Sequence, residues 1–135
     1  MKSFAIFFCL IIPFISLQSQ TLQSKNYATV GYIKNDGTIQ NSSYKTLGYI
    51  KEDGKIADSN YQTLGYIKND GTILDSSYRV MGYLKEDGKM LDSNYRTLGY
   101  IKDDGTIQNS NYATIGYAKG IPKKRAVVYF FFFDF

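Results

Sequence analysis

Several residue types that usually carry enzyme chemistry are missing or scarce in this 135-residue sequence. It contains no histidine, no tryptophan, two prolines and a single cysteine, Cys9. Without histidine there is no imidazole to act as a general base or a metal ligand, and a single cysteine cannot form an intrachain disulfide. The sequence also lacks a glycine-rich phosphate loop and a nucleophile elbow. We therefore expect a protein that is not an enzyme and needs no cofactor.

The first residues follow the order of a secretory signal peptide. Lys2 precedes an apolar run over residues 4–17, and small and polar residues follow up to position 20. Such a run is shorter than a membrane-spanning helix and is flanked as a signal peptide is. We predict that residues 1–20 are a signal peptide and that the protein is exported to the periplasm, the cell surface or the medium. Cleavage would also remove Cys9.

Most of the remaining sequence consists of copies of one 17-residue unit. The clearest copy, YKTLGYIKEDGKIADSN, spans residues 44–60. Similarity at a fixed period is typical of proteins whose units bury their apolar faces against one another. We therefore expect residues 21–135 to form one repeat domain. The copies begin at Tyr27, Tyr44, Tyr61, Tyr78, Tyr95 and Tyr112.

Each complete copy contains a β-hairpin signal, an Asp-Gly pair between two β-prone runs, because glycine adopts the positive φ of a tight turn at no steric cost. A two-residue turn would pair Ile50 with Ala57. A three-residue loop ending at Gly54 would instead pair Ile50 with Ile56. Only the second register places two large aliphatic side chains opposite each other in every copy, and a slip of one residue would misplace them all. We predict the three-residue loop.

A polar stretch closes each copy, such as residues 58–60, and predicts a second turn, because these side chains hydrogen-bond their own backbone. Each unit therefore has two strands of about five residues. Every first strand also contains a glycine, which weakens a strand unless a bulge or a close neighbour needs the space. Two explanations are open: Gly48 and its equivalents admit a tyrosine ring of a neighbouring repeat, or each marks a simple bulge. The glycines are Gly31, Gly48, Gly65, Gly82, Gly99 and Gly116.

Half repeats flank the complete copies. Residues 21–26 align with the second half of a repeat, and residues 112–119 form a first half that lacks the Asp-Gly turn. Two orphan halves are able to pair with each other and close the chain into a ring. Closure would also remove free sheet edges, which are an aggregation hazard.

The last ten residues, AVVYFFFFDF, are apolar at both odd and even positions, the pattern of a strand buried on both faces. Burying a phenylalanine contributes roughly 1.5–3 kcal/mol. We therefore predict a buried C-terminal strand through the middle of the molecule. An aromatic last strand is also typical of outer-membrane barrels, but their strands need about 9–11 residues. The shorter, charged repeat strands predict a protein that does not span a membrane.

The net charge of +4 gives no support for nucleic-acid binding. Between residues 27 and 111, ten lysines and arginines face eleven acidic residues, a near balance. Part of the excess is the run Lys123-Lys124-Arg125, which we expect in a solvated loop, with a role in topology or contact with an anionic surface as the alternatives. The repeated Asp-Gly carboxylates lack the alternating ligands of a calcium-binding EF-hand loop, and we expect them to stabilise the turns.

Two series of tyrosines are the features with potential to bind a ligand. Exposed tyrosines stack on sugars or peptides, and repeated copies would bind multivalently. In the alternative interpretation, one series packs the core and the other supports the turns. The partner itself is unknown, with a glycan or an envelope protein as candidates. The predicted ligand-facing series is Tyr32, Tyr49, Tyr66, Tyr83, Tyr100 and Tyr117.

Copies of YxTLGYIKxDGxIxDSN behind a signal peptide, with a phenylalanine-rich end, resemble the five-fold β-flower proteins secreted by Bacteroidota. The resemblance covers residues 21–135 and implies an all-β fold in which five hairpin petals form a closed ring, with no established activity. Five intact Asp-Gly turns agree with that number, while the two half repeats leave a sixth unit open. A β-solenoid would not require an Asp-Gly turn in each coil, and hairpin repeats that bind choline or cell wall typically use tryptophan.

We expect a non-enzymatic exported scaffold or binding protein of the bacterial cell envelope. One alternative is a structural or assembly protein that uses the phenylalanine-rich tail as an interface, and another is a carbohydrate-binding repeat module. A hydrolase would need two acidic side chains facing each other in the centre of the ring.

Overall fold

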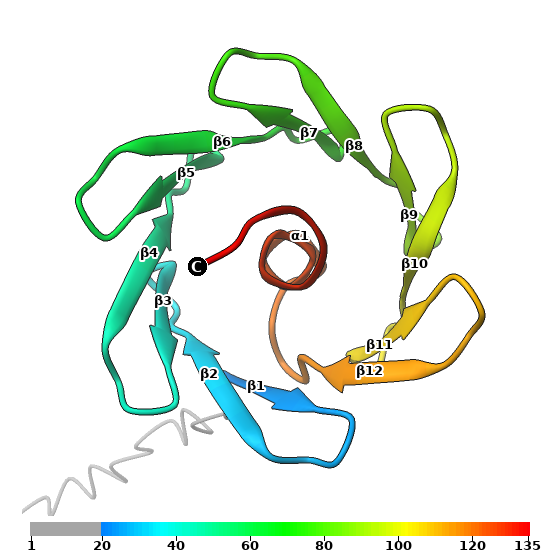
Figure 1. Ribbon diagram of the computed structural model, residues 1–135, viewed down its shortest axis with the longest axis horizontal. Coiled ribbons are helices and arrows are strands. Elements are labelled where there is room, and N and C mark those ends of the chain that lie inside the picture. The colour runs from blue at the N-terminus through cyan, green and yellow to red at the C-terminus, as the bar shows by residue number, and fades with distance from the viewer. Residues whose placement is uncertain (1–19) are drawn as a thin grey trace, which may run out of the picture.

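The structure is a computed structural model that describes residues 20–135, which form twelve strands followed by two short helical segments (Figure 1). The predicted signal peptide, apart from residue 20, lies outside the described residues. The strands are β1 (Thr21–Ser24), β2 (Thr29–Ile33), β3 (Thr38–Asn41), β4 (Thr46–Ile50), β5 (Lys55–Asp58), β6 (Thr63–Ile67), β7 (Thr72–Asp75), β8 (Val80–Leu84), β9 (Lys89–Asp92), β10 (Thr97–Ile101), β11 (Thr106–Asn109) and β12 (Thr114–Tyr117). The helical segments are α1 (Lys123–Val127) and the π-helix η1 (Val128–Phe132).

The twelve strands form one closed antiparallel ring. Each strand pairs with its neighbours in sequence, and β1 pairs with β12 through Gln23 opposite Tyr117 and Ser24 opposite Gly116. The two half repeats therefore meet, and the predicted closure of an all-β ring is confirmed. Within residues 20–135, every strand has two partners and no edge is left for pairing with another chain.

Six hairpin petals make up the ring, rather than five (Figure 1). Each petal is formed by two consecutive strands joined by a polar turn at its outer tip: β1–β2, β3–β4, β5–β6, β7–β8, β9–β10 and β11–β12. The Asp-Gly loops connect one petal to the next, so five loops join six petals. The number of intact loops is therefore one less than the number of petals.

The Asp-Gly loops have the predicted three-residue form. Ile50 pairs with Ile56 across the loop, and the N–H of Gly54 donates to the carbonyl of Lys51 at 2.9 Å. Gly54 has φ 91°, the left-handed conformation expected at the bulge position. The Asp53 carboxylate accepts a hydrogen bond of 3.0 Å from the backbone N–H of Lys55. This aspartate therefore stabilises the turn, as predicted.

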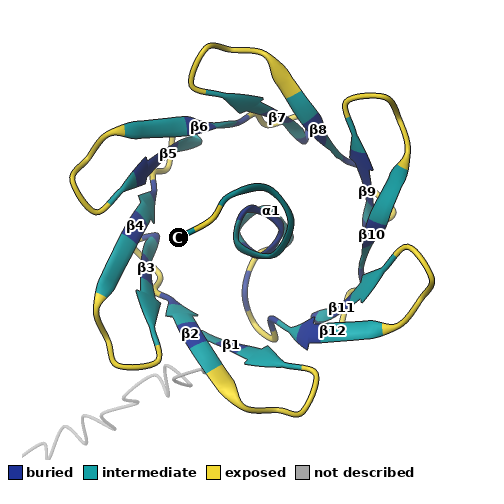
Figure 2. Cartoon of the chain, viewed as in Figure 1, coloured by how far each residue is buried: buried dark blue, intermediate teal, exposed yellow. Residues whose placement is uncertain are grey.

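A ring of buried aliphatic side chains lines the inside of the barrel. In Figure 2 the buried, dark blue stretches lie on the strands and at the centre, whereas the outer tips of the petals are exposed and yellow. Side chains alternate between the two faces of a strand, so Gly31 and Ile33 point inward while Tyr32 points outward. Among the described residues, no polar or charged side chain is buried. The ring is thus held by apolar packing, mainly from Leu22, Ile33, Ile39, Ile50, Ile56, Ile67, Ile73, Leu84, Met90, Ile101 and Ile107.

A β-bulge precedes each strand glycine, which confirms one of the two predicted explanations. Ile39 pairs with Gly48 and Gln40 with Thr46, so Leu47 is the additional residue. The other explanation, a neighbouring tyrosine ring, is wrong. A Cβ at Gly48 would lie 2.5 Å from the carbonyl oxygen of Ala57 and 2.9 Å from the ring of Phe135. The glycine therefore admits a phenylalanine of the tail.

The C-terminal tail enters the ring as a helix and not as the predicted strand (Figure 1). Ala126, Val127 and Val128 are fully buried, whereas the phenylalanines are only partly buried. The tail lies in the middle of the molecule, as predicted, but the prediction of a strand is wrong and the predicted burial of the phenylalanines is only partial. A strand directs its side chains to two opposite sides, but a ring surrounds the tail on every side. A helix satisfies that geometry because its side chains point outward in all directions.

Successive phenylalanines lie against successive petals. The ring of Phe133 lies 2.7 Å from the position of a Cβ on Gly65, and the preceding phenylalanines lie against the next petals in turn. Six petals are about 60° apart, whereas an α-helix rotates by about 100° per residue. A π-helix rotates less per residue, because its hydrogen bonds span five residues, and so follows the petals better. The pairs are Phe130 with Gly116, Phe131 with Gly99, Phe132 with Gly82, Phe133 with Gly65 and Phe135 with Gly48.

The basic run before the phenylalanines is attached to the Asp-Gly loops, and its predicted place in a solvated loop is wrong. Arg125 donates from Nη1 to the carbonyl oxygens of Lys34 and Asn35 at 3.0 and 2.9 Å. Lys124 donates to a carbonyl of the β6–β7 loop, and Lys123 forms an ion pair with a carboxylate of the β10–β11 loop. Three consecutive side chains therefore hold three alternate loops.

Candidate functional site

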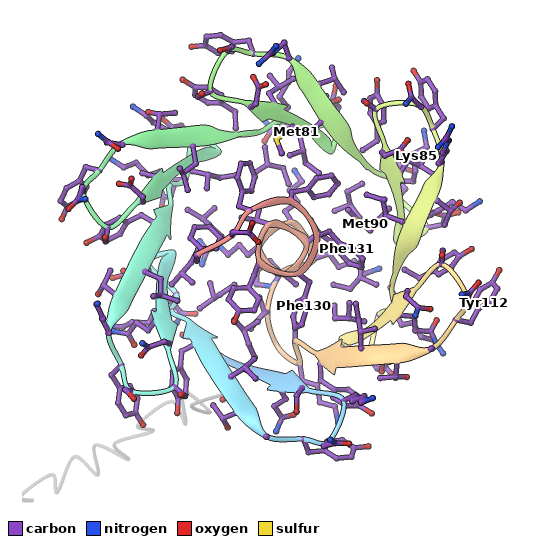
Figure 3. All side chains as sticks on the ribbon, in the orientation of Figure 1. Met81, Lys85, Met90, Tyr112, Phe130 and Phe131 are labelled. Carbon is purple, nitrogen blue, oxygen red and sulfur yellow. The ribbon has the colours of Figure 1, made fainter. Side chains whose placement is uncertain are left out.

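Six stacked pairs of tyrosines surround the outside of the ring, and we call them the tyrosine belt. Each predicted ligand-facing tyrosine stacks on a tyrosine from the polar turn of the next petal, and Figure 3 shows one of the turn tyrosines, Tyr112, at an outer tip. The belt therefore joins neighbouring petals. The pairs are Tyr32–Tyr44, Tyr49–Tyr61, Tyr66–Tyr78, Tyr83–Tyr95, Tyr100–Tyr112 and Tyr117–Tyr27.

The rings of each pair are nearly parallel, and in four of the six pairs the two hydroxyl oxygens are 3.2–3.3 Å apart. In the Tyr32–Tyr44 pair the ring centroids are 4.9 Å apart and the planes differ by 11°. The hydroxyl of Tyr32 donates to that of Tyr44 at 3.3 Å. The Tyr117–Tyr27 pair, which closes the belt, has a centroid distance of 4.7 Å and a hydroxyl distance of 3.2 Å. Each petal is therefore joined to both of its neighbours by a stacked pair.

The polar turns place a tyrosine where the Asp-Gly loops place a glycine. Asn41 accepts hydrogen bonds from the N–H groups of Ser43 and Lys45 through Oδ1, and its carbonyl accepts the N–H of Tyr44. Tyr44 consequently has φ 66°, and its five equivalents have φ 65°. A left-handed residue with a Cβ costs about 1–2 kcal/mol. Six such outliers in equivalent positions point to a use for the aromatic ring.

The two tyrosine series differ in exposure. The turn series is 61–67% exposed, whereas the predicted ligand-facing series is half-buried. The structure thus places the more accessible rings on the series that begins the repeats. The alternative in which one series packs the core is wrong, because neither series belongs to the buried cluster. The sequence does contain a signal for the turn series: five of these six tyrosines follow an Asp or Asn by three positions, and Tyr27 follows Ser24.

This closed ring of 17-residue hairpin repeats also matches a protein-family model. The model describes the 5-fold beta-flower protein and matches residues 19–134. The chain belongs to the β-flower family. No curated protein and no solved structure matches it. In this β-flower protein the five Asp-Gly loops connect six petals.

Hydrogen bonding within the tyrosine belt alters the acidity of one series. In four pairs the half-buried tyrosine of this β-flower protein donates a hydrogen bond to its stacked partner, and the partner hydroxyl raises the pKa of the half-buried tyrosine above its ordinary value in all six. Ionising Tyr32, for example, would remove the proton that it donates to Tyr44. The half-buried phenols are therefore held in their protonated form at neutral pH.

The carboxylates of the β-flower protein serve its loops. Accepted backbone N–H groups lower the pKa of Asp36, Asp70 and Asp104, with Thr38, Thr72 and Thr106 as the donors. Among residues 20–135, no cluster of three or more His, Cys, Asp or Glu is placed to hold a metal. In the same part of the chain the ring centre is apolar, so the facing carboxylates expected of a hydrolase are not found there. The described residues also contain no helix long and apolar enough to cross a membrane.

Proposed function

We propose that this β-flower protein is a non-enzymatic exported scaffold of the bacterial cell envelope that binds a repetitive ligand through its tyrosine belt. The observation that supports this proposal is the left-handed conformation of six exposed tyrosines. Glycine or asparagine would occupy these turns with less strain. Stacking on the partner tyrosine uses one side of each ring, and the exposed remainder, repeated six times, is available for contact with something outside the fold.

The form of the belt indicates the form of the ligand. In each pair, one face of the turn tyrosine is covered by its partner and the other face remains free to stack on a sugar ring or a peptide. A single face of this kind binds weakly. Six equivalent faces bind a polymer with repeated units much more tightly, provided that several contacts form together. A glycan or a repetitive envelope protein has the required periodicity.

Glycan arrays and pull-downs from envelope fractions test this function directly. We expect wild-type protein to bind in a multivalent manner, so that affinity falls steeply as turn tyrosines are replaced. Replacement of all six by asparagine, which adopts the left-handed conformation, would preserve the turns and abolish binding. Replacement of all six by phenylalanine keeps the rings and should retain most of the binding. Blank arrays and pull-downs with the wild type would contradict the proposal.

An assembly role is a second candidate, and the partial burial of the tail phenylalanines supports it. Clustered aromatic side chains that stay partly exposed are typical of a surface that another molecule covers. Light scattering over a range of concentrations would detect self-association. Replacement of Phe135 by serine should then favour the monomer, and a wild type that remains monomeric at every concentration would remove self-assembly as an explanation.

A further inference from the structure

We propose that the six pairs of the tyrosine belt are sites of oxidative crosslinking, at which hydrogen peroxide and a haem peroxidase convert each pair to dityrosine. This inference is independent of any ligand. It depends on the distance between the two phenols of a pair, on their exposure, and on the way in which the pairs connect the petals.

The geometry of the pairs brings the reacting carbons close together. The ring planes differ by 4–11° and the centroids lie 4.7–5.0 Å apart. The hydroxyl oxygens are nearer, at 3.2 Å in the Tyr49–Tyr61 and Tyr100–Tyr112 pairs. Because both the ring centroids and the hydroxyl oxygens of these pairs are within 5.0 Å, the ortho carbons beside the hydroxyls are within reach of the partner ring. Two phenoxyl radicals couple at these carbons.

The reaction balances with one peroxide per link. The oxidant removes one electron and one proton from each phenol, which leaves two phenoxyl radicals. A carbon–carbon bond forms between the two ortho carbons, and the hydrogen on each of these carbons moves to the oxygen as aromaticity returns. Overall, two tyrosines and one hydrogen peroxide give one dityrosine and two waters. Each link therefore removes two hydrogen atoms from the protein.

The belt is accessible to an oxidant in solution, because the turn tyrosines are 61–67% exposed. The remaining tyrosine, Tyr129, provides an internal comparison. It lies in the tail and its neighbouring rings are phenylalanines, Phe130 at 5.2 Å and Phe135 at 6.4 Å. Phenylalanine has no phenolic hydrogen to lose. Tyr129 therefore has no partner for coupling, while the other twelve tyrosines are already paired.

Crosslinking of all six pairs would join the petals into a covalent ring. Each petal carries one tyrosine that faces the preceding petal and one that faces the following petal, for example Tyr44 and Tyr49 in the β3–β4 petal. The Tyr117–Tyr27 link would connect residues 90 positions apart and close the chain. Residues 20–135 contain no cysteine. Dityrosine would thus give an exported chain the covalent ties that disulfides provide elsewhere.

Treatment of the purified protein, in dilute solution, with horseradish peroxidase and hydrogen peroxide tests the proposal. We expect dityrosine fluorescence, a mass loss of two hydrogens per link up to six links, and no increase in chain mass on denaturing gels. After trypsin digestion, peptide 26–34 should be joined to peptide 35–45 and to peptide 103–119. Absence of dityrosine, links between molecules only, or links between tyrosines that are not stacked would each overturn the proposal.

Matched variants separate pairing from general reactivity. Tyr32→Phe and Tyr44→Phe each preserve the stacked rings but remove one phenol, so each should abolish the 32–44 link and retain the other five. Tyr129→Phe should leave all six links unchanged. Wild type unfolded in urea should lose this selectivity, because the pairing depends on the fold. Equal loss of all links in the Tyr129→Phe variant, or the same link pattern in urea, would contradict the inference.

Discussion

The polar turns show how a single residue position combines a backbone cost with a side-chain benefit. Tyr44 occupies the left-handed position that Gly54 occupies in the neighbouring loop. Its Cβ makes this conformation unfavourable, and its ring stacks on Tyr32 of the preceding petal. The conformation persists because the Asn41 side chain and backbone fix the turn around it.

Replacements at Tyr44 should therefore reverse the usual order of alanine and glycine. Both Tyr44→Gly and Tyr44→Ala remove the ring, but alanine keeps the Cβ that is unfavourable at φ 66°. We expect the glycine variant to be more stable than the alanine variant by about 1 kcal/mol in urea unfolding. An alanine variant that equals or exceeds the glycine variant would show that the turn relaxes out of the left-handed conformation.

The strand glycines are the second position at which one residue matters. A Cβ on Gly82 would contact the carbonyl oxygen of Leu91 and lie 2.6 Å from the ring of Phe132. At Gly31 a Cβ would lie 2.5 Å from the carbonyl of Gln40, but no phenylalanine is close. Gly82 is thus restricted by both the neighbouring strand and the C-terminal tail, whereas Gly31 is restricted by the neighbouring strand alone.

Gly82→Ala should consequently destabilise the protein more than Gly31→Ala. Overpacking of this kind typically costs about 1–3 kcal/mol, and we expect the Gly82 variant near the upper end of that range. Urea unfolding of both variants measures the difference. Combination of Gly82→Ala with Phe132→Ala should cost less than the sum of the two single changes, because the second removes one of the clashes.

At the scale of elements, the tail changes its helical form to suit two different sets of neighbours. The α-helical part rotates by about 100° per residue. Alternate loops of a six-petal ring are about 120° apart, so consecutive residues of α1 point to alternate loops. The π-helical part rotates less per residue and follows individual petals. At its end, the N–H of Phe133 donates a hydrogen bond to the carbonyl of Val128. Basic residues therefore lie on the first part and phenylalanines on the second.

Two kinds of Asp-Gly loop alternate around the ring. The basic side chains of α1 hold one kind, and the two kinds differ in sequence. The loops that the basic side chains hold begin with Asn-Asp or Asp-Asp, at Asn35, Asn69 and Asp103. The intervening loops carry the exposed glutamates Glu52 and Glu86. The ring of six petals is thus a ring of three double repeats where it meets the helix.

The three basic side chains should contribute unequally to stability. Arg125 donates to two backbone carbonyls, and hydrogen bonds from a charged group contribute about 1.5–3 kcal/mol. Lys123 pairs with a carboxylate on a side chain that is 98% exposed, and such pairs contribute about 0–1 kcal/mol. We expect Arg125→Ala to lower the free energy of unfolding more than Lys123→Ala. Added salt should weaken the effect of Lys123→Ala alone.

At the scale of the whole molecule, the tyrosine belt should make the folded ring less stable at alkaline pH. Hydrogen bonding raises the pKa of the half-buried series above the ordinary value of 10.0. A raised pKa in the folded state adds stability below the unfolded value, and this stability is lost as the pH rises through the folded value. We expect the urea midpoint to be constant near neutral pH and to fall above about pH 10.

A matched variant isolates the belt from the rest of the alkaline titration. Replacement of all six turn tyrosines by phenylalanine removes the acceptors and should return the pKa of the remaining series toward its ordinary value. Absorbance of tyrosinate during an alkaline titration reports this shift. Identical titration curves for the variant and the wild type would show that the stacked hydroxyls do not interact in solution.

Local sequence patterns determined much of this fold. The Asp-Gly pair and the opposed aliphatic residues predicted the register of Ile50 with Ile56, since both depend on residues a few positions apart. The two half repeats predicted that β1 and β12 would pair. The aspartates were predicted to stabilise their own turns. The first and third of these interactions occur within every complete repeat. The second follows because the two terminal half repeats together make one complete unit.

Only the tertiary structure decided how these units are used. The apolar tail has the pattern of a buried strand, yet it is helical because petals surround it on all sides and a strand can face only two of them. The stacking of the two tyrosine series arises between petals, where residues twelve positions apart or at opposite ends of the chain meet. A 17-residue period specifies a petal, whereas the number of petals and the space at their centre arise only when the ring closes.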